Sequence, residues 1–263
     1  MIILGKDTPQ FLYHTIKATL KSEELNIEVL ESIDSTNSYA KRYAAEACDR
    51  TPSLFVALEQ SAGRGRVGRS FISRRDRGIY MTLLYFADDI SDTVRVTTSA
   101  AVAVALSIEE ITGKKMKIKW VNDIFDEYGK VSGILVEGVP CEIGYAVVIG
   151  VGINVGEGEF PEELIGIASS IGEIGSDRGR LISQIADRLL DIAKNPADTS
   201  YMEDYRARFM LRGKQVELIG VDGGARLGRV LGVEDDGGLI IEGDGGREVI
   251  RSGSVSVRIK ENG

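Results

Sequence analysis

The sequence is poor in the side chains that most often form metal sites, disulfides and acid–base catalytic groups. Its 263 residues include one histidine, His14, and two cysteines, Cys48 and Cys141. A single histidine far from any glycine-rich loop argues against a zinc site and a histidine-based catalytic triad. Two cysteines form no disulfide framework, so a reducing cytoplasm is the expected compartment. Chemistry here must therefore depend on arginine, lysine, asparagine and aspartate.

The sequence also lacks a hydrophobic run long enough to cross a membrane or to form the core of a signal peptide. The longest nearly apolar run, residues 145–155, is too short to span a bilayer and is interrupted by glycines and Asn154. The apolar residues 1–4 are too few for a signal-peptide core, and Lys6 and Asp7 follow closely. We therefore expect neither a membrane partner nor secretion.

Length and composition indicate a globular protein with an acidic surplus. Hydrophobic residues make up 43% and charged residues 27% of the chain, as in ordinary soluble domains. A chain of this length can bury a large core and divides naturally into one large and one small domain. The 32 basic and 40 acidic residues leave a formal charge of −8, so a local cluster of basic residues stands out.

Residues 60–77 form such a cluster, with six arginines (64, 66, 69, 74, 75 and 77) and one acid, Asp76. Interleaved glycines let backbone N–H groups approach an anion, and each guanidinium can bind a phosphate or carboxylate through two hydrogen bonds. Two interpretations stay open here: a solvated, mobile loop, or a site for anionic ligands. The glycine spacing at 63–68 matches the dinucleotide fingerprint only weakly, because no helical pattern follows it.

Hydrophobic periodicity predicts a mixture of helices and strands up to about residue 212. Asp34 or Ser35 is expected to cap one helix and Asp92 another. Gly150 and Gly152 interrupt a predicted strand, which indicates that another group approaches the backbone there. Helices are predicted at residues 10–21, 38–47, 93–111, 176–194 and 199–209, and strands at 27–30, 54–59, 78–86, 117–120, 131–137 and 142–155.

The chain after Arg212 differs from the rest in composition and in the length of its apolar runs. Residues 213–263 hold 13 of the 31 glycines, at turn-like intervals between short alternating runs. Four or five short strands in so few residues indicate a small β-barrel. We therefore expect an α+β fold: a mixed or antiparallel sheet packed with helices in residues 1–212, and a small barrel in residues 213–263.

Five short blocks follow one another in an order shared with one enzyme family. They are residues 35–37 (Ser-Thr-Asn), 63–69 (Gly-Arg-Gly-Arg-Val-Gly-Arg), 119–123 (Lys-Trp-Val-Asn-Asp), 130–137 (Lys-Val-Ser-Gly-Ile-Leu-Val-Glu) and 150–154 (Gly-Val-Gly-Ile-Asn). Over residues 27–260 the chain resembles the biotin–protein ligases, also called biotin–[acetyl-CoA-carboxylase] ligases. The resemblance implies a class II synthetase-like catalytic domain and a C-terminal SH3-like domain.

Two positions depart from the family pattern: Val121 stands where proline is usual, and Phe71 where tryptophan is common. The residues ahead of position 27 are too few for the winged helix-turn-helix of the ligase-repressors. The resemblance is therefore to the short class that lacks this DNA-binding domain.

The resemblance implies a two-step ligase. The carboxylate of biotin attacks the α-phosphate of ATP, which gives biotinyl-5′-AMP and pyrophosphate, and a lysine of a biotin carboxyl carrier protein then attacks the mixed anhydride. Bringing two anions together requires positioning and charge neutralisation, which the arginines and lysines could supply. The resemblance further implies Mg²⁺ accompanying ATP, with no protein metal ligands assigned. It also implies a cytoplasmic homodimer without a nucleic-acid partner.

The resemblance also assigns roles to individual residues. The catalytic cations would be Arg66, Lys119 and Lys130. The biotin-binding residues would be Ser35, Thr36, Asn37, Gln60, Gly63, Arg64, Gly65, Arg66, Lys130, Gly133 and Leu135. The ATP-binding residues would be Arg66, Arg69, Phe71, Lys119, Asn122, Asp123, Lys130 and Asn154.

Other interpretations of the same residues stay open. Lys119 and Lys130 could be solvent-facing strand lysines, and Trp120 is expected in the core in either case. A nucleic-acid-binding protein could use the same arginines, but an acidic chain with one basic cluster argues against extended phosphate tracking. The nearer alternative is a lipoate/octanoate–protein ligase or transferase on a related fold. Competition between biotin and lipoate for adenylation separates these two enzymes.

Overall fold

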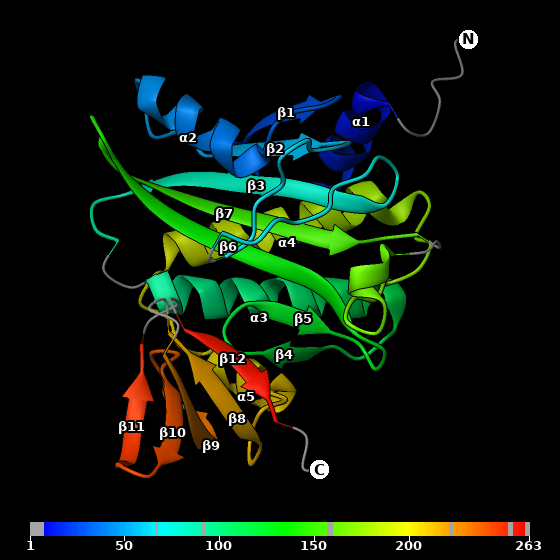
Figure 1. Ribbon diagram of the computed structural model, residues 1–263. Coiled ribbons are helices and arrows are strands. Elements are labelled where there is room, and N and C mark those ends of the chain that lie inside the picture. The colour runs from blue at the N-terminus through cyan, green and yellow to red at the C-terminus, as the bar shows by residue number, and fades with distance from the viewer. Residues whose placement is uncertain are drawn as a thin grey trace.

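The computed structural model describes residues 8–66, 68–90, 93–156, 160–220, 224–251 and 255–260. The apolar residues 1–4 and the predicted helix cap Asp92 lie outside these ranges. Within them the chain forms two β-sheets and five α-helices, and the larger sheet crosses the centre of the molecule (Figure 1).

The larger sheet has seven strands in the order β1-β2-β3-β7-β6-β5-β4. The β1–β2 pair is parallel and the other pairs are antiparallel, so the predicted mixed sheet is confirmed. The strands are β1 Asn26–Leu30, β2 Ser53–Ala57, β3 Gly78–Ala87, β4 Lys117–Lys119, β5 Asp123–Phe125, β6 Lys130–Cys141 and β7 Gly144–Asn154.

Helices cover both faces of this sheet (Figure 1). Side chains alternate along each strand, so Leu54 and Val56 of β2 join one core, and Phe55 packs with Ala40 and Ala44 of α2 on the other side. The helices are α1 Pro9–Thr19, α2 Thr36–Glu46, α3 Thr93–Thr112, α4 Asp177–Lys194 and α5 Met202–Arg208, with a short 3₁₀ helix, η1, at Glu162–Leu164.

Helix α2 begins two residues earlier than its pattern predicts. Ser35 is the N-cap, and its side chain accepts a hydrogen bond from the Ser38 N–H at 3.5 Å. The other predicted cap, Asp34, instead accepts two hydrogen bonds from Arg42, which lower the pKa of its carboxyl to about 2. Thr36 and Asn37 therefore lie in the first helical turn, where both are buried.

Helix α3 is buried on every side along its middle, whereas both of its ends are partly exposed. All residues of 97–105 are buried, including three with hydroxyl groups. The cause is that α4, α5 and the large sheet all contact this helix. The hydroxyls of Thr97 and Ser99 donate to carbonyls within the helix, which satisfies them without an external partner.

The C-terminal residues form a five-stranded antiparallel sheet in the order β11-β10-β9-β8-β12, which confirms the four or five short strands expected after Arg212. Trp120 is buried and donates its indole N–H to the Gly237 carbonyl at 2.9 Å, which joins this sheet to the larger one. The buried side chains of this five-stranded sheet belong to the same hydrophobic core as those of the seven-stranded sheet. The strands are β8 Gln215–Ile219, β9 Ala225–Val233, β10 Leu239–Gly243, β11 Gly246–Ile250 and β12 Ser256–Ile259.

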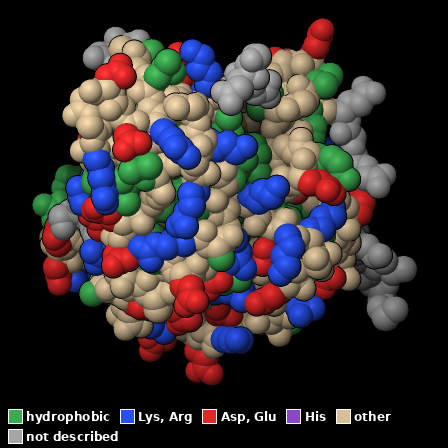
Figure 2. Space-filling view, turned by 90° about the horizontal axis from the view of Figure 1, so that it is seen from below, with side chains coloured by type: hydrophobic (Ala, Val, Ile, Leu, Met, Phe, Trp, Pro, Cys, Tyr) green, Lys and Arg blue, Asp and Glu red, His purple; other side chains and the backbone are tan. Residues whose placement is uncertain are grey.

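The described surface carries charges of both signs. Over the face seen from below in Figure 1, basic and acidic side chains lie near one another (Figure 2). In the part of the chain that the structure describes, no helix is long and apolar enough to cross a membrane.

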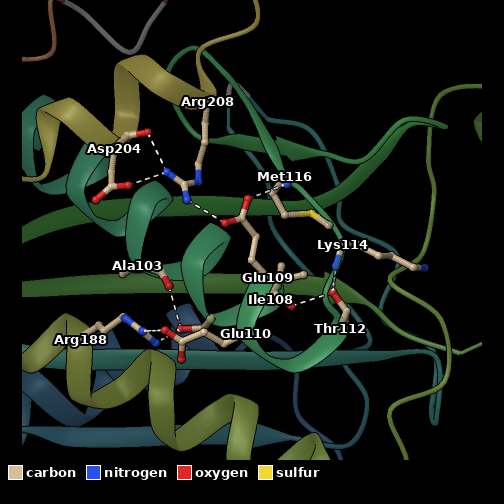
Figure 3. A network of polar contacts seen from close by, with 11 residues as sticks. Ala103, Ile108, Glu109, Glu110, Thr112, Lys114, Met116, Arg188, Asp204 and Arg208 are labelled. Atoms are coloured by element: carbon tan, nitrogen blue, oxygen red, sulfur yellow. Dashed lines mark hydrogen bonds and ion pairs between the residues drawn. The ribbon is translucent and has the colours of Figure 1, made fainter.

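An ionic network that is largely buried at Glu109 and Arg208 and half-exposed at Asp204 joins α3 to α5 (Figure 3). Arg208 donates to Glu109 Oε2 and to Asp204 Oδ1, both at 2.7 Å, and the Met116 N–H donates to Glu109 Oε1 at 2.9 Å. The side chains of Glu109 and Arg208 are only 12% and 14% exposed. Burial raises the pKa of Glu109, but the hydrogen bonds from Arg208 and Met116 outweigh it and leave the pKa below its ordinary value.

Replacing Arg208 by methionine should lower the free energy of unfolding by about 3 kcal/mol, because the carboxylate of Glu109 stays buried without its cation. The pKa of Glu109 is lower in the folded than in the unfolded chain, so its contribution is present above about pH 4.5 and is lost as the pH falls further. The difference in free energy of unfolding between wild type and the Arg208 variant should therefore be smaller at pH 4 than at pH 7. Urea denaturation at both pH values measures this difference.

Arg180→Met is the matched control, because Arg180 is exposed and lies 3.9 Å from Asp177. It should change the free energy of unfolding by less than about 1 kcal/mol. Equal effects of the two substitutions would contradict a stabilising role for the buried network.

Candidate functional site

The register of the large sheet places several predicted site residues on one face. Lys119 pairs with Asp123, Asp123 with Gly133, and Gly133 with Gly152. Residues directly opposite one another in a ladder project to the same face, so these four form a row across β4, β5, β6 and β7. This row therefore brings together residues from three of the sequence blocks.

A second row, parallel to the first, connects the site to α2. Leu135 pairs with Gly150, Gly150 with Thr82, and Thr82 with Phe55. Phe55 packs against α2, so both rows lie on the α2 side of the sheet. The first turn of α2 therefore faces the same surface as Lys119 and Asp123.

A cavity of about 570 Å³ lies over this face. Fifteen of the seventeen residues that the sequence assigned to binding or catalysis line this cavity. They are Ser35, Thr36, Asn37, Gln60, Arg64, Gly65, Arg66, Arg69, Phe71, Lys119, Asn122, Asp123, Lys130, Gly133 and Leu135.

The other two, Gly63 and Asn154, lie behind the cavity lining. A Cβ atom on Gly63 would stand 2.3 Å from the Phe71 carbonyl oxygen, so a glycine is needed where these loop segments touch. Asn154 donates through Nδ2 to the carbonyls of Ser169 at 2.9 Å and Lys130 at 3.3 Å. Both residues hold lining segments in place, and a direct contact with ligand stays a prediction.

One end of the cavity is lined by amides and hydroxyls that bond to one another. Gln60 Oε1 accepts from the Thr36 N–H at 2.8 Å and from the Thr36 hydroxyl at 3.1 Å. The buried hydroxyl of Thr82 lies 2.8 Å from both Thr36 Oγ1 and Asn37 Oδ1. This end is neutral and offers both donors and acceptors, which suits a polar, uncharged ring.

Two of the glycines of β7, Gly150 and Gly152, make room for side chains from other segments. A Cβ on Gly150 would lie 2.0 Å from Asn37 Oδ1, and a Cβ on Gly152 would lie 2.7 Å from the ring of Phe71. The expected close approach to the backbone is thus confirmed at both positions. Phe71 also contacts Tyr80 edge-to-face, with ring centroids 6.3 Å apart, and therefore lies against the sheet as one wall of the cavity.

The other end of the cavity holds the cations. Lys130 Nζ lies 2.6 Å from Asp123 Oδ1, and Arg66 donates to Asn122 Oδ1 at 2.7 Å. Lys119 is half-buried, with its Nζ 5.9 Å from the centroid of the Phe125 ring. Burial lowers the pKa of both the Arg66 guanidinium and the Lys119 ammonium. Partly desolvated cations gathered in this way favour an anionic ligand.

The loop that carries Arg64, Arg66 and Arg69, called the arginine loop from here on, folds back on itself over the cavity. The Gly65 N–H donates to the Arg69 carbonyl at 2.7 Å, and the Phe71 N–H donates to the Gly63 carbonyl at 2.9 Å. No helix follows Gly68: the chain enters β3 instead, so the weak dinucleotide match has no structural counterpart. The loop presents Arg64, Arg66 and Arg69 to the cavity.

Sequence reasoning missed several lining residues, above all those of the C-terminal sheet. Val255, Val257 and Arg258 line the cavity from β12 and its approach. Arg258 adds a cation near Lys119, whose pKa it helps to lower. No local motif marks these residues, because only the packing of the two sheets brings them to the site. The others missed are Ser70, Met81, Trp120, Ile134, Gly150, Val151, Gly152 and Ile167.

The donor set does not fit a resident metal ion. Among the described residues no group of three His, Cys, Asp or Glu side chains could hold one. Asp123 is the one carboxylate among the described lining residues, and it is paired with Lys130. A divalent cation that arrives with a polyphosphate needs only one or two protein carboxylates, which this site can supply.

Known proteins are similar to this chain in sequence and in fold. A model described as the biotin/lipoate A/B protein ligase family matches residues 29–154, and one described as the biotin protein ligase C-terminal domain matches residues 212–258. The chain is 33% identical to the bifunctional ligase/repressor BirA of Bacillus spizizenii, over 92% of this chain and 78% of that protein. It is 35% identical to BirA of Bacillus subtilis, over 78% of this chain and 66% of that protein.

Two further similarities concern proteins named for ligase activity. The chain is 28% identical to a biotin–[acetyl-CoA-carboxylase] ligase of Mycobacterium tuberculosis, over 87% of this chain and 88% of that protein. Its structure is similar to that of a biotin protein ligase from Aquifex aeolicus in complex with biotin and ATP, with a TM-score of 0.75 and 27% identity. That match covers 89% of this chain and 99% of the other.

Replacing Gly150 by alanine should destabilise the protein and displace Asn37, because the added methyl group overlaps its amide oxygen. We expect a loss of about 1–3 kcal/mol in the free energy of unfolding, as for other overpacked sites. Gly245→Ala is the control, because nothing lies within 4 Å of its added Cβ, and it should be neutral or slightly stabilising. Denaturant unfolding of both variants tests this; indistinguishable curves would contradict the close packing.

Proposed function

The chain belongs to the biotin/lipoate A/B protein ligase family, and on that premise we propose that it is a biotin–protein ligase. It activates biotin with ATP and transfers the biotinyl group to a lysine of a biotin carboxyl carrier protein. The observation that carries the proposal is one cavity with a neutral hydrogen-bonding end and a cationic end. Those two ends suit the ureido ring of biotin and the meeting of its carboxylate with a triphosphate.

The neutral end is the proposed biotin pocket. The ureido ring has two N–H donors and one carbonyl acceptor, which the groups of Thr36, Asn37 and Gln60 complement. Gly133 and Leu135 of β6 supply backbone and an apolar wall for the fused rings. The valeryl chain would then run towards Lys130, which places its carboxylate among the cations.

The cationic end is the proposed site of adenylation. A carboxylate oxygen of biotin attacks the α-phosphorus of ATP, the bond to the β-phosphate bridging oxygen breaks, and pyrophosphate leaves. Arg66, Lys119 and Lys130 reduce the repulsion between the two anions and hold them in line. Asp123, 2.6 Å from Lys130, directs this ammonium group, and an incoming phosphate favours the charged form of Lys119, against the effect of burial.

In the second step the amine of the carrier lysine attacks the carbonyl carbon of biotinyl-5′-AMP. An amide bond forms, the bond between the carbonyl carbon and the phosphate oxygen breaks, AMP leaves and the amine loses a proton. The same cations stabilise the departing phosphate. Phe71, Arg69, Asn122 and Asn154 are the proposed nucleotide-side residues, with Mg²⁺ entering as Mg-ATP beside Asp123.

The remaining assignments are also proposals. We place a catalytic unit at residues 1–212 and a C-terminal unit at residues 213–263 that completes the site through β12. The glycine-rich composition after Arg212 supports the division, and the lining residues Val257 and Arg258 support the contribution of the C-terminal unit to the site. The free cysteines Cys48 and Cys141 suit a reducing cytoplasm. A homodimer is proposed from the family resemblance alone.

The decisive experiment measures pyrophosphate release from Mg-ATP with biotin, with lipoate and without either acid. A biotin–protein ligase releases pyrophosphate only with biotin, and then labels a carrier lysine. Lipoate-dependent release without biotin-dependent release would instead identify a lipoate–protein ligase.

In that assay Lys130→Met should lower the rate roughly 100- to 1,000-fold, because one charge contact to the developing phosphate negative charge is lost. Lys115→Met is the matched control: Lys115 is exposed in the connection before β4 and outside the cavity, so its loss should leave the rate unchanged. Normal turnover by the Lys130 variant would remove that residue from the mechanism.

Biotin with Mg-ATP should protect the arginine loop from trypsin. Arg64 and Arg69 are exposed, and mutual repulsion among the loop cations is relieved when an anion binds between them. We expect cleavage after these arginines to be fast in the empty protein and slow with both substrates. Cleavage after Lys115 in the same samples should be independent of ligand, and equal rates at the loop in both conditions would exclude its closure over substrate.

A further inference from the structure

Glu137 of β6 lies beside the cavity without lining it. Its carboxylate accepts a hydrogen bond from Asn37 Nδ2 at 3.0 Å and one from Lys41 Nζ at 2.9 Å, both from α2. Arg64 of the arginine loop lies 3.9 Å from the same carboxylate. The side chain is only 22% exposed. Glu137 thus connects the helix that carries the polar end of the site with the loop that carries the cations.

The hydrogen bonds around Asn37 fix which way its amide points. Nδ2 donates to Glu137 and to the Leu135 carbonyl at 3.3 Å, and Oδ1 accepts from Thr82 at 2.8 Å. A reversed amide would set its oxygen against two groups that can only accept. The reversed orientation is therefore disfavoured, and Glu137 contributes most to this because it is charged.

The far end of the same network is fixed in a similar way. Gln60 Nε2 donates to Ser73 Oγ at 2.7 Å, and that hydroxyl donates to the Phe71 carbonyl at 3.0 Å. The Gln60 oxygen must then face Thr36, as it does. The network thus ends at two groups that can only accept, the Glu137 carboxylate beside Asn37 and the Phe71 carbonyl beyond Ser73. The amide oxygens of Asn37 and Gln60 therefore both point towards the hydroxyls of Thr82 and Thr36, which lie between them.

Asn37 has no room to leave this position. Asn37 is 4% exposed, and its amide oxygen occupies the space that a side chain at position 150 would fill. Burial raises the pKa of Glu137, but the hydrogen bonds from Asn37 and Lys41 outweigh it, so the pKa lies below its ordinary value and the group is a carboxylate at neutral pH. The orientation of Asn37 is therefore set by a fixed negative charge behind it.

We propose that Glu137 is a positioning residue for the biotin pocket. It acts through Asn37, whose amide it orients, and it attracts the guanidinium of Arg64, which lies 3.9 Å from its carboxylate. The identity of the ligand rests on the proposed function, whereas the effect of Glu137 on Asn37 rests on the contacts alone. Loss of Glu137 should therefore weaken biotin binding without slowing the chemical step once biotin is bound.

Three variants test this proposal. Glu137→Ala removes the contacts with Asn37, Lys41 and Arg64, and Glu137→Gln keeps the shape and one acceptor oxygen but not the charge. Glu28→Ala is the matched control, because the Glu28 carboxylate also accepts a hydrogen bond from α2, from the Tyr39 hydroxyl at 2.9 Å, yet lies away from the cavity. Titration calorimetry gives the Kd for biotin, and pyrophosphate release at saturating biotin gives kcat.

We expect Glu137→Ala to raise the Kd for biotin about 10- to 100-fold, the loss expected for one charge-assisted hydrogen bond. The kcat at saturating biotin should stay within about threefold, because the lost interaction serves binding rather than the transition state. Glu137→Gln should lie between alanine and wild type, and Glu28→Ala should match wild type. An unchanged Kd in folded Glu137→Ala, or an equal loss in Glu28→Ala, would overturn the proposal.

A second measurement needs no ligand. The side-chain amide signals of Asn37, assigned by comparison with Asn37→Asp, should shift and exchange faster with solvent in Glu137→Ala than in wild type. Glu137→Gln serves instead if the alanine variant does not fold, and its Asn37 signals must move as well. Unmoved signals would overturn the positioning role even if biotin binds, whereas absence of biotin binding by wild type would refute only the proposed function.

Discussion

The site depends on two glycines that leave part of one sheet face without side chains. Gly150 and Gly152 stand in the middle of β7, and their neighbours on β6 and β3 project to the same face. Asn37 approaches the backbone at the first glycine and Phe71 at the second. Without these two gaps, neither α2 nor the arginine loop could approach the sheet closely enough to enclose a cavity.

A second constraint on the site is that polar partners hold two of its cations in place. Lys130 is paired with Asp123, and Arg66 is hydrogen-bonded to Asn122. These partners keep the cations oriented while burial lowers the pKa of Arg66 and Lys119. An anionic ligand therefore meets cations that are already positioned and incompletely solvated, which makes its binding more favourable than binding to the same residues on an open surface.

Sequence reasoning located most of the cavity because its residues occur in short blocks, each on one strand, loop or helix start. Register then aligns those blocks, as the row from Lys119 to Gly152 illustrates. Two things could not be predicted. Gly63 and Asn154 support the lining because of contacts between distant segments, and β12 reaches the cavity only through the packing of the second sheet. The burial of residues 97–105 of α3 on every side likewise reflects tertiary neighbours that no periodicity reveals.

The wall supplied by β12 has a consequence for folding. Ser35 and Arg258 line the same cavity although they stand near opposite ends of the chain, so the cavity is complete only when the last strand has docked. Contacts of such high sequence separation form late, because closing the long intervening loops costs entropy first. A partly folded chain therefore has an open, solvated site with little affinity for substrates, and ligand binding draws the folding equilibrium towards the state in which both sheets are joined.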